Sequence, residues 1–160
     1  MNNDNHNEDR HAARAAQSLG KFVHLSKDCL ERRGLFAIDR PLILNGLRTF
    51  LACLIRRVVP GAAVNFISQL PSALQEELLD QPAGPDEAID RPLIERALRR
   101  SLKLKSSESA AALEAYIEAV TISVSHGEVH AFSSQLPMTL REPFETAYAN
   151  ERLLQQNSVA

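Results

Sequence analysis

Two histidines, His126 and His130, form the residue pair whose type and spacing come closest to those of a metal site. They stand four residues apart at the start of a predicted short helix, with Glu128 between them, and this spacing allows two imidazoles to share one metal ion. Zinc requires at least a third protein ligand, and the neighbouring sequence supplies none. We therefore predict no cofactor and interpret the segment as a solvated helix start in which Glu128 complements the helix dipole, while metal binding by the two histidines stays open.

Four basic residues gather on one side of the helix predicted for residues 90–104. We call them the basic face: Arg96, Arg99, Arg100 and Lys103. Such a face can bind phosphates on nucleic acid or an acidic partner, or it can simply be solvated. Nucleic-acid binding is disfavoured, because the net charge is −2 and no aromatic residue is interleaved to stack on bases. The basic face is kept as a candidate anion-binding surface.

The sequence lacks the motifs that usually accompany covalent or nucleotide chemistry. It contains no Gly-x-Ser-x-Gly, no P-loop and no Gly-x-Gly-x-x-Gly. Cys29 and Cys53 have no Cys-x-x-Cys spacing, so we interpret them as buried thiols in a reducing compartment. We predict that the protein is not an enzyme.

No segment of the sequence predicts a membrane span or an export signal. Arg48, Arg56 and Arg57 interrupt the most apolar stretches, well short of the roughly 20 residues that a span needs. Residues 1–10 are rich in Asn and Asp and lack the basic and then apolar layout of a secretory signal. We therefore expect a cytoplasmic protein that does not bind membranes.

The elements that carry these residues are indicated by an internal repeat. The tetrapeptide Ser-Gln-Leu-Pro occurs at residues 68–71 and again at 134–137, and the surrounding chain matches itself at an offset of 66 residues without a gap. The matched positions are mainly apolar or turn positions, so the repeat preserves an architecture rather than an active site. Pairs at this offset include Leu47 with Leu113, Phe50 with Tyr116, Leu54 with Val120, Phe66 with Phe132 and Leu74 with Leu140.

The periodicity of apolar residues predicts helices in each copy of the repeat. Apolar stripes at helical spacing cover residues 41–58 and 107–125, and Ile122 is an apolar residue on the outer side of the second stripe, where it hints at a partner surface. Further helices are predicted at residues 21–33, 62–69, 71–80, 90–104, 128–135 and from 137 onward. Pro143 should kink or restart the last of these, giving a final helix at about 142–154.

The two Ser-Gln-Leu-Pro segments are predicted to be structural corners between helices. Proline disfavours the helical conformation in the residue before it and suits the first turn of the helix that follows. The glutamine side chain is expected to satisfy backbone groups left open at the corner. The corner residues are Ser68, Gln69, Leu70, Pro71, Ser134, Gln135, Leu136 and Pro137.

Residues 61–71 and 127–137, each a turn and a short helix that ends in Gln-Leu-Pro, resemble the bacterial domain of unknown function numbered 2267. The resemblance covers roughly residues 21–144. Gly127-Glu128 fits the turn of the family pattern, whereas Gly61-Ala62 lacks its carboxylate. The resemblance implies an all-helical bacterial protein without an assigned reaction, and it brings no catalytic residues.

The sequence therefore predicts an all-α helical bundle made of two tandem four-helix repeats with a pseudo-two-fold relation. The expected organisation is a disordered or partly helical tail at 1–17, a single domain at 18–154 with repeats at 21–80 and 86–154, and a flexible tail at 155–160.

The expected function is that of a non-enzymatic cytosolic module for protein–protein interaction or self-association, with an unknown protein or a second copy as the partner. One alternative is an anion or nucleic-acid binder that uses the basic face. The other is a carrier of a small apolar ligand, with a pocket between the repeats lined by Phe50, Tyr116, Phe66 and Phe132.

Overall fold

The structure, a computed structural model, describes the backbone of residues 3–158 and the side chains of residues 18–158. Helices make up all the regular structure of this part of the chain, so the prediction of an all-α fold is confirmed. None of these helices is long and apolar enough to cross a membrane. The elements are α1 (Asn3–Arg32), α2 (Arg40–Arg57), α3 (Pro60–Ile67), α4 (Ser72–Leu79), α5 (Arg91–Leu102), a 3₁₀ turn (Ser106–Glu108), α6 (Ser109–Ser123), α7 (His126–Ser133) and α8 (Met138–Asn157).

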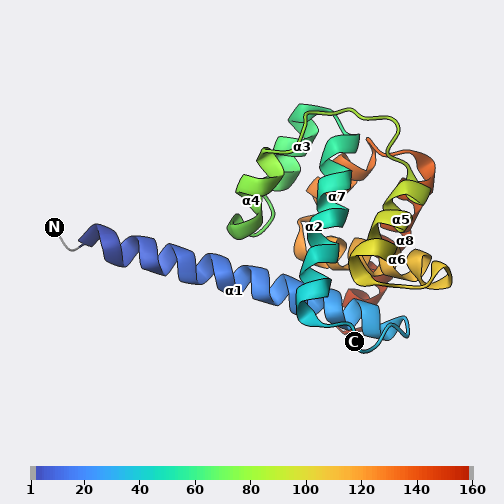
Figure 1. Cartoon of the computed structure of the whole chain (residues 1–160), viewed down its shortest axis with the longest axis horizontal. Helices are drawn as coiled ribbons and strands as arrows, with labels where there is room; N and C mark the ends of the chain where they lie inside the picture. The colour runs from blue at the N-terminus through green and yellow to red at the C-terminus, as the bar shows by residue number, and fades with distance from the viewer. Residues whose placement is uncertain (1–2, 159–160) are drawn as a thin grey trace.

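Helices α2 and α6 form the centre of the body, and the other helices pack around them (Figure 1). α5 packs against both α2 and α6, α8 packs against α6 and α7, and α3 packs against α7. The second half of α1 packs against α6, α2 and α4, whereas its first half extends away from the body (Figure 1). The apolar faces predicted from the periodicity are the faces that these contacts bury.

The ends of three helices differ from the predicted ones. α1 begins at Asn3 and joins the segment at 21–33 to most of the predicted tail, while Met1 and Asn2 lie outside the described residues. α8 runs without a restart from Met138 to Asn157, into the predicted flexible tail, of which residues 159 and 160 lie outside the described part. α5 ends at Leu102 because Lys103 adopts the left-handed conformation, with φ 56°.

Both Ser-Gln-Leu-Pro segments form helix-to-helix corners, but the glutamines do not have the predicted role. Gln69 and Gln135 are exposed, and among the described residues neither side chain bonds to the corner backbone. Instead, the hydroxyl of Ser68 donates to the carbonyl three residues earlier at 2.6 Å, and that of Ser134 does the same at 2.7 Å. A short hydroxyl side chain reaches its own helix end without a long detour, so serine, not glutamine, satisfies the open carbonyl.

The Leu-Pro part of each corner turns the chain into the next helix as predicted. Leu70 and Leu136 are buried, which anchors both corners in the core. Pro71 and Pro137 directly precede α4 and α8 in extended or near-extended conformations. Their carbonyl groups accept the first backbone hydrogen bonds of these helices, both at 2.9 Å.

Candidate functional site

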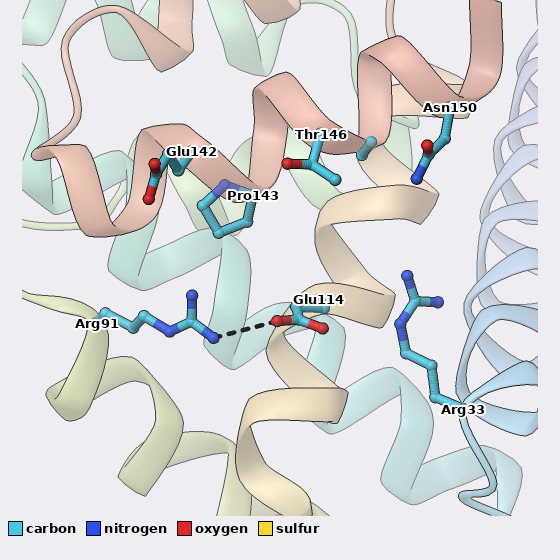
Figure 2. A pocket seen from close by; sticks show the side chains of 8 residues that line it. Arg33, Arg91, Glu114, Glu142, Pro143, Thr146 and Asn150 are labelled. Carbon is cyan, nitrogen blue, oxygen red and sulfur yellow. Dashed lines mark hydrogen bonds and ion pairs between the residues drawn. The ribbon is translucent and has the colours of Figure 1, made fainter. Parts of the chain in front are cut away.

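The most polar concave site among the described pockets lies where four helices meet. It has a volume of about 410 Å³ and lies between the end of α1, the start of α5, the middle of α6 and the first half of α8. In Figure 2, Arg91 and Arg33 approach it from opposite sides, with Glu114 between them and the α8 side chains above. The lining residues are Arg33, Arg91, Glu114, Glu142, Pro143, Thr146, Ala147 and Asn150.

Arg91, the first residue of α5, is held in place by two carboxylates. Asp90 caps the helix by accepting the backbone N–H of Leu93 at 2.9 Å, which sets the position from which Arg91 starts. The guanidinium donates from Nε to Glu95 at 2.7 Å and from Nη2 to Glu114 at 3.3 Å (Figure 2). Burial alone would lower the pKa of Arg91, but the hydrogen bonds and charges of Glu95 and Glu114 raise the pKa above its usual value.

Arg91 also compensates for a proline inside α8. Pro143 has no backbone N–H, so the carbonyl of Thr139 four residues earlier loses its helical partner. Nη1 of Arg91 donates to this carbonyl at 3.4 Å. The replacement donor explains how α8 continues through Pro143 where a restart was predicted, and it makes Arg91 a link between α5, α6 and α8.

We expect Arg91→Ala to lower the free energy of unfolding by about 1–2 kcal/mol, because a half-buried charged donor and three of its bonds are lost. Urea denaturation measures the change. In a Pro143→Ala background the same substitution should cost less, since Thr139 then regains a backbone donor. Arg141→Ala, which removes only an exposed pair within α8, is the matched control and should change stability by less than about 0.5 kcal/mol.

Arg33 closes the opposite side of the pocket, just beyond the end of α1. Its Nη1 donates to the Cys29 carbonyl at 3.1 Å and to the carboxylate of Glu118 on α6. Arg32 contacts the same carboxylate at 3.0 Å and also donates to the Cys29 sulfur at 3.1 Å. Burial, followed by the charge of Glu118, raises the pKa of the Cys29 thiol to about 11, so this cysteine is a buried free thiol as predicted.

A second hollow of about 110 Å³ extends the site along α8. It shares Arg33, Ala147 and Asn150 with the first, so the two form one continuous depression that we call the α8 groove. Its far end is apolar, since Ile122 is 41% exposed and Leu154 is 65% exposed. The groove therefore has a charged end at Arg91 and an apolar end at Leu154.

Helical spacing explains how two helices build this groove. On α6, Glu114, Glu118 and Ile122 follow one another at intervals of four residues and form one stripe. On α8, residues 143, 147, 150 and 154 do the same at intervals of three or four. The two stripes face the same depression, and Ile122, which the sequence suggested as part of a partner surface, lies in it.

The basic face is on the surface, away from the lining of the α8 groove. Arg96, Arg100 and Lys103 are exposed, and Arg99 is half-buried and donates to the Ser106 hydroxyl at 2.9 Å. Three of the four lie on α5 as predicted, and Lys103 follows its last residue.

The two histidines lie near each other in a pocket of about 430 Å³ between α7 and α8. Nε2 of His126 lies 3.1 Å from a carboxylate oxygen of Glu151, and its ring meets that of Tyr148 edge to face at 4.9 Å between centroids. His130 is exposed. Within the described residues, no three His, Cys, Asp or Glu side chains come together in a way that could hold a metal ion.

The four aromatic residues proposed for a ligand carrier are buried and stack on one another. The ring centroids of Phe66 and Phe132 are 4.1 Å apart, and those of Phe50 and Tyr116 are 5.7 Å apart. Each ring therefore occupies space that a ligand would need. The described pockets are lined by other residues.

Sequence inspection did not find the α8 groove, because its residues come from four separate segments. Arg33, Arg91, Glu114 and Glu142 each look like ordinary surface charges in the sequence. Pro143 was the one available signal, since a proline inside a helix leaves a carbonyl that another group can satisfy. That signal identifies the orphan carbonyl but not its donor.

Comparison with known families matches residues 45–143 to one family model, described as Uncharacterized conserved protein (DUF2267). The matched region runs from within α2 to the first turns of α8. No curated protein matches the chain.

Proposed function

Since the chain belongs to the family of uncharacterized conserved proteins DUF2267, for which no reaction is assigned, we propose its function from the α8 groove: a non-enzymatic cytoplasmic module that binds a protein partner there. Part of the groove lies outside the matched region, because Arg33 precedes it and residues 146–154 follow it. The partner preference would then differ among family members that differ in these segments.

The observation that carries this proposal is the pairing of two exposed apolar side chains in one depression. A single exposed Ile or Leu is ordinary on a protein surface, but Ile122 and Leu154 line the same hollow from different helices. An apolar side chain of a partner that fills this end would remove both from water. Short helices and peptides are commonly bound in grooves of this type.

The charged end of the groove supports specificity rather than chemistry. Arg91 is bonded to Glu95 and Glu114, and Arg33 is bonded to Glu118, so these side chains form a preorganised rim. Charged groups at the rim of an interface orient a partner and reject wrong ones more than they add affinity. We propose that the apolar end anchors the partner and that the charged end sets its direction.

We expect Leu154→Glu to weaken partner binding roughly tenfold or more, because burial of one leucine contributes about 1.5–3 kcal/mol. Leu153→Glu is the matched control: Leu153 is the adjacent residue, is 57% exposed and does not line the groove. The measurement is quantitative mass spectrometry of proteins captured from a lysate by the immobilised wild type and each variant. Sedimentation velocity of the purified protein tests a second copy as the partner.

The proposal would be wrong if the wild type stays monomeric and captures nothing. It would also be wrong if both leucine variants lose their captured proteins equally, since an added surface charge would then explain the loss. Equal thermal unfolding midpoints of the two variants are required, so that loss of fold is not mistaken for loss of binding.

We also propose that the two halves are tandem four-helix repeats related by a pseudo-two-fold axis. α3 and α7 begin and end at positions 66 residues apart, and both corners use the same serine bonds. In addition, Phe66 stacks on Phe132 and Phe50 on Tyr116, so residues at equivalent positions contact each other. Contact between equivalents is what a two-fold axis between the halves would produce. In an experimental structure, a rotation close to 180° should superpose the halves.

A further inference from the structure

The basic face is unusual within this protein because its charges have no acidic partners. Within the part of the chain whose side chains are described, Arg96, Arg100 and Lys103 form no ion pair, and the bond of Arg99 goes to the neutral hydroxyl of Ser106. Arginines elsewhere in the body are paired with carboxylates. These paired arginines are Arg32, Arg33, Arg48, Arg56, Arg91 and Arg141.

The location on α5 explains only part of this pattern. Cations in the last turn of a helix are stabilised by its dipole, and this accounts for Arg99 and Arg100. Arg96 lies earlier in the helix, where the dipole effect has faded. Like charges spaced three or four residues apart repel one another, so the cluster does not stabilise α5 by itself.

Lys103 adds a cation at a position that normally favours glycine. It follows the last residue of α5 with φ 56° and ψ 48°, the left-handed conformation in which a side chain is disfavoured. Glycine is the usual residue at this point of a helix end, yet here a lysine extends the basic face. A residue retained in a disfavoured conformation is a reason to ask what its side chain contacts.

From this uncompensated cluster, we propose that the basic face binds the phosphate backbone of double-stranded nucleic acid. From Arg96 to Lys103 the helix rises about 10 Å, which matches about three phosphates at the 3.4 Å spacing of one strand. The weak negative net charge of the whole chain limits long-range attraction, but it does not neutralise a local face that lacks acidic partners.

Two features of α5 favour a duplex over other polyanionic partners. The apolar side of the helix, Ile94, Leu98 and Leu102, is buried in the core, so α5 cannot embed in a bilayer as an interfacial helix does. The basic face contains no aromatic residue, and binding of single strands depends strongly on stacking of bases on aromatic rings. The contacts available to this face are therefore contacts to phosphates.

The experiment is fluorescence anisotropy with a labelled DNA duplex of about 20 base pairs, titrated with the full chain at low salt. We expect binding that weakens as salt rises. Arg96→Gln with Arg100→Gln should weaken binding at least tenfold and reduce the slope of log K against log salt by about 2, since each phosphate contact contributes about 0.9. Lys103→Asn should reduce the slope by about 1, because asparagine tolerates the left-handed conformation and keeps the helix end intact.

The matched control is Arg48→Gln with Arg141→Gln, which removes the same charge from paired arginines on α2 and α8. This variant should keep most of the duplex affinity. Leu154→Glu in the α8 groove should bind the duplex as the wild type does, so failure of this inference is distinct from failure of the proposed partner site.

Several results would overturn the inference. They are no binding to the duplex at low salt, an equal loss of affinity in the control variant, and binding to single strands as tight as binding to the duplex. Tighter binding to vesicles of phosphatidylserine and phosphatidylcholine than to DNA would also assign the face to a membrane surface instead.

Discussion

Phe66→Ala is expected to lower the free energy of unfolding by about 3–5 kcal/mol, the range for truncating a fully buried phenylalanine. Phe66 on α3 stacks on Phe132 on α7, with the rings 21° from parallel. Removing one ring leaves a cavity between the two helices and also ends the stacking interaction. Since α3 and α7 belong to different halves of the chain, the loss should be seen as one cooperative transition at lower denaturant concentration.

Guanidinium denaturation followed by circular dichroism measures this change. Phe132→Ala and the double variant complete a cycle, and we expect a coupling energy of about 0.5–1.5 kcal/mol between the rings. Val64→Ala is the matched control on the same helix, because Val64 is 53% exposed and should change stability by less than about 0.5 kcal/mol. Two separate unfolding transitions in the Phe66 variant would contradict the view that the halves share one core.

Gly46→Ala is expected to destabilise the protein by about 3 kcal/mol, although alanine normally stabilises a helix interior relative to glycine. Gly46 is buried in α2, and an added Cβ would overlap the hydroxyl of Tyr116 and lie 2.8 Å from Cδ2 of Leu102. Tyr116 cannot move freely, because its hydroxyl donates to the Ile43 carbonyl at 2.8 Å. The substitution must therefore displace a fully buried ring or break a buried hydrogen bond.

The control substitutions for this prediction are Gly61→Ala and Gly127→Ala. Both glycines lie in the first turn of a helix, and an added Cβ would meet no atom within 4 Å at either position. These variants should keep or raise stability, by up to about 1 kcal/mol. Thermal and urea unfolding of the three variants check the sign. A Gly46→Ala protein that is as stable as the Gly61→Ala protein would show that the core around Tyr116 can yield.

The basic face and the α8 groove differ in how far a sequence can indicate them. Arg96, Arg99 and Arg100 lie on one helix, so helical periodicity alone places them together. The same periodicity could not show that carboxylates pair with the other arginines and leave these unpaired. In the α8 groove, Arg33 and Leu154 are 121 positions apart in the numbering, and no local pattern connects them.

The sequence by itself determined the helices, the two proline corners and the faces that are buried, because periodicity and proline stereochemistry act over a few residues. Only the tertiary structure decided what meets across these faces. It placed Arg91 at the carbonyl that Pro143 leaves open, made Gly46 necessary through Tyr116, and brought Ile122 beside Leu154. Each of these contacts joins segments distant in the chain, so it depends on how whole helices pack and not on the residues next to it.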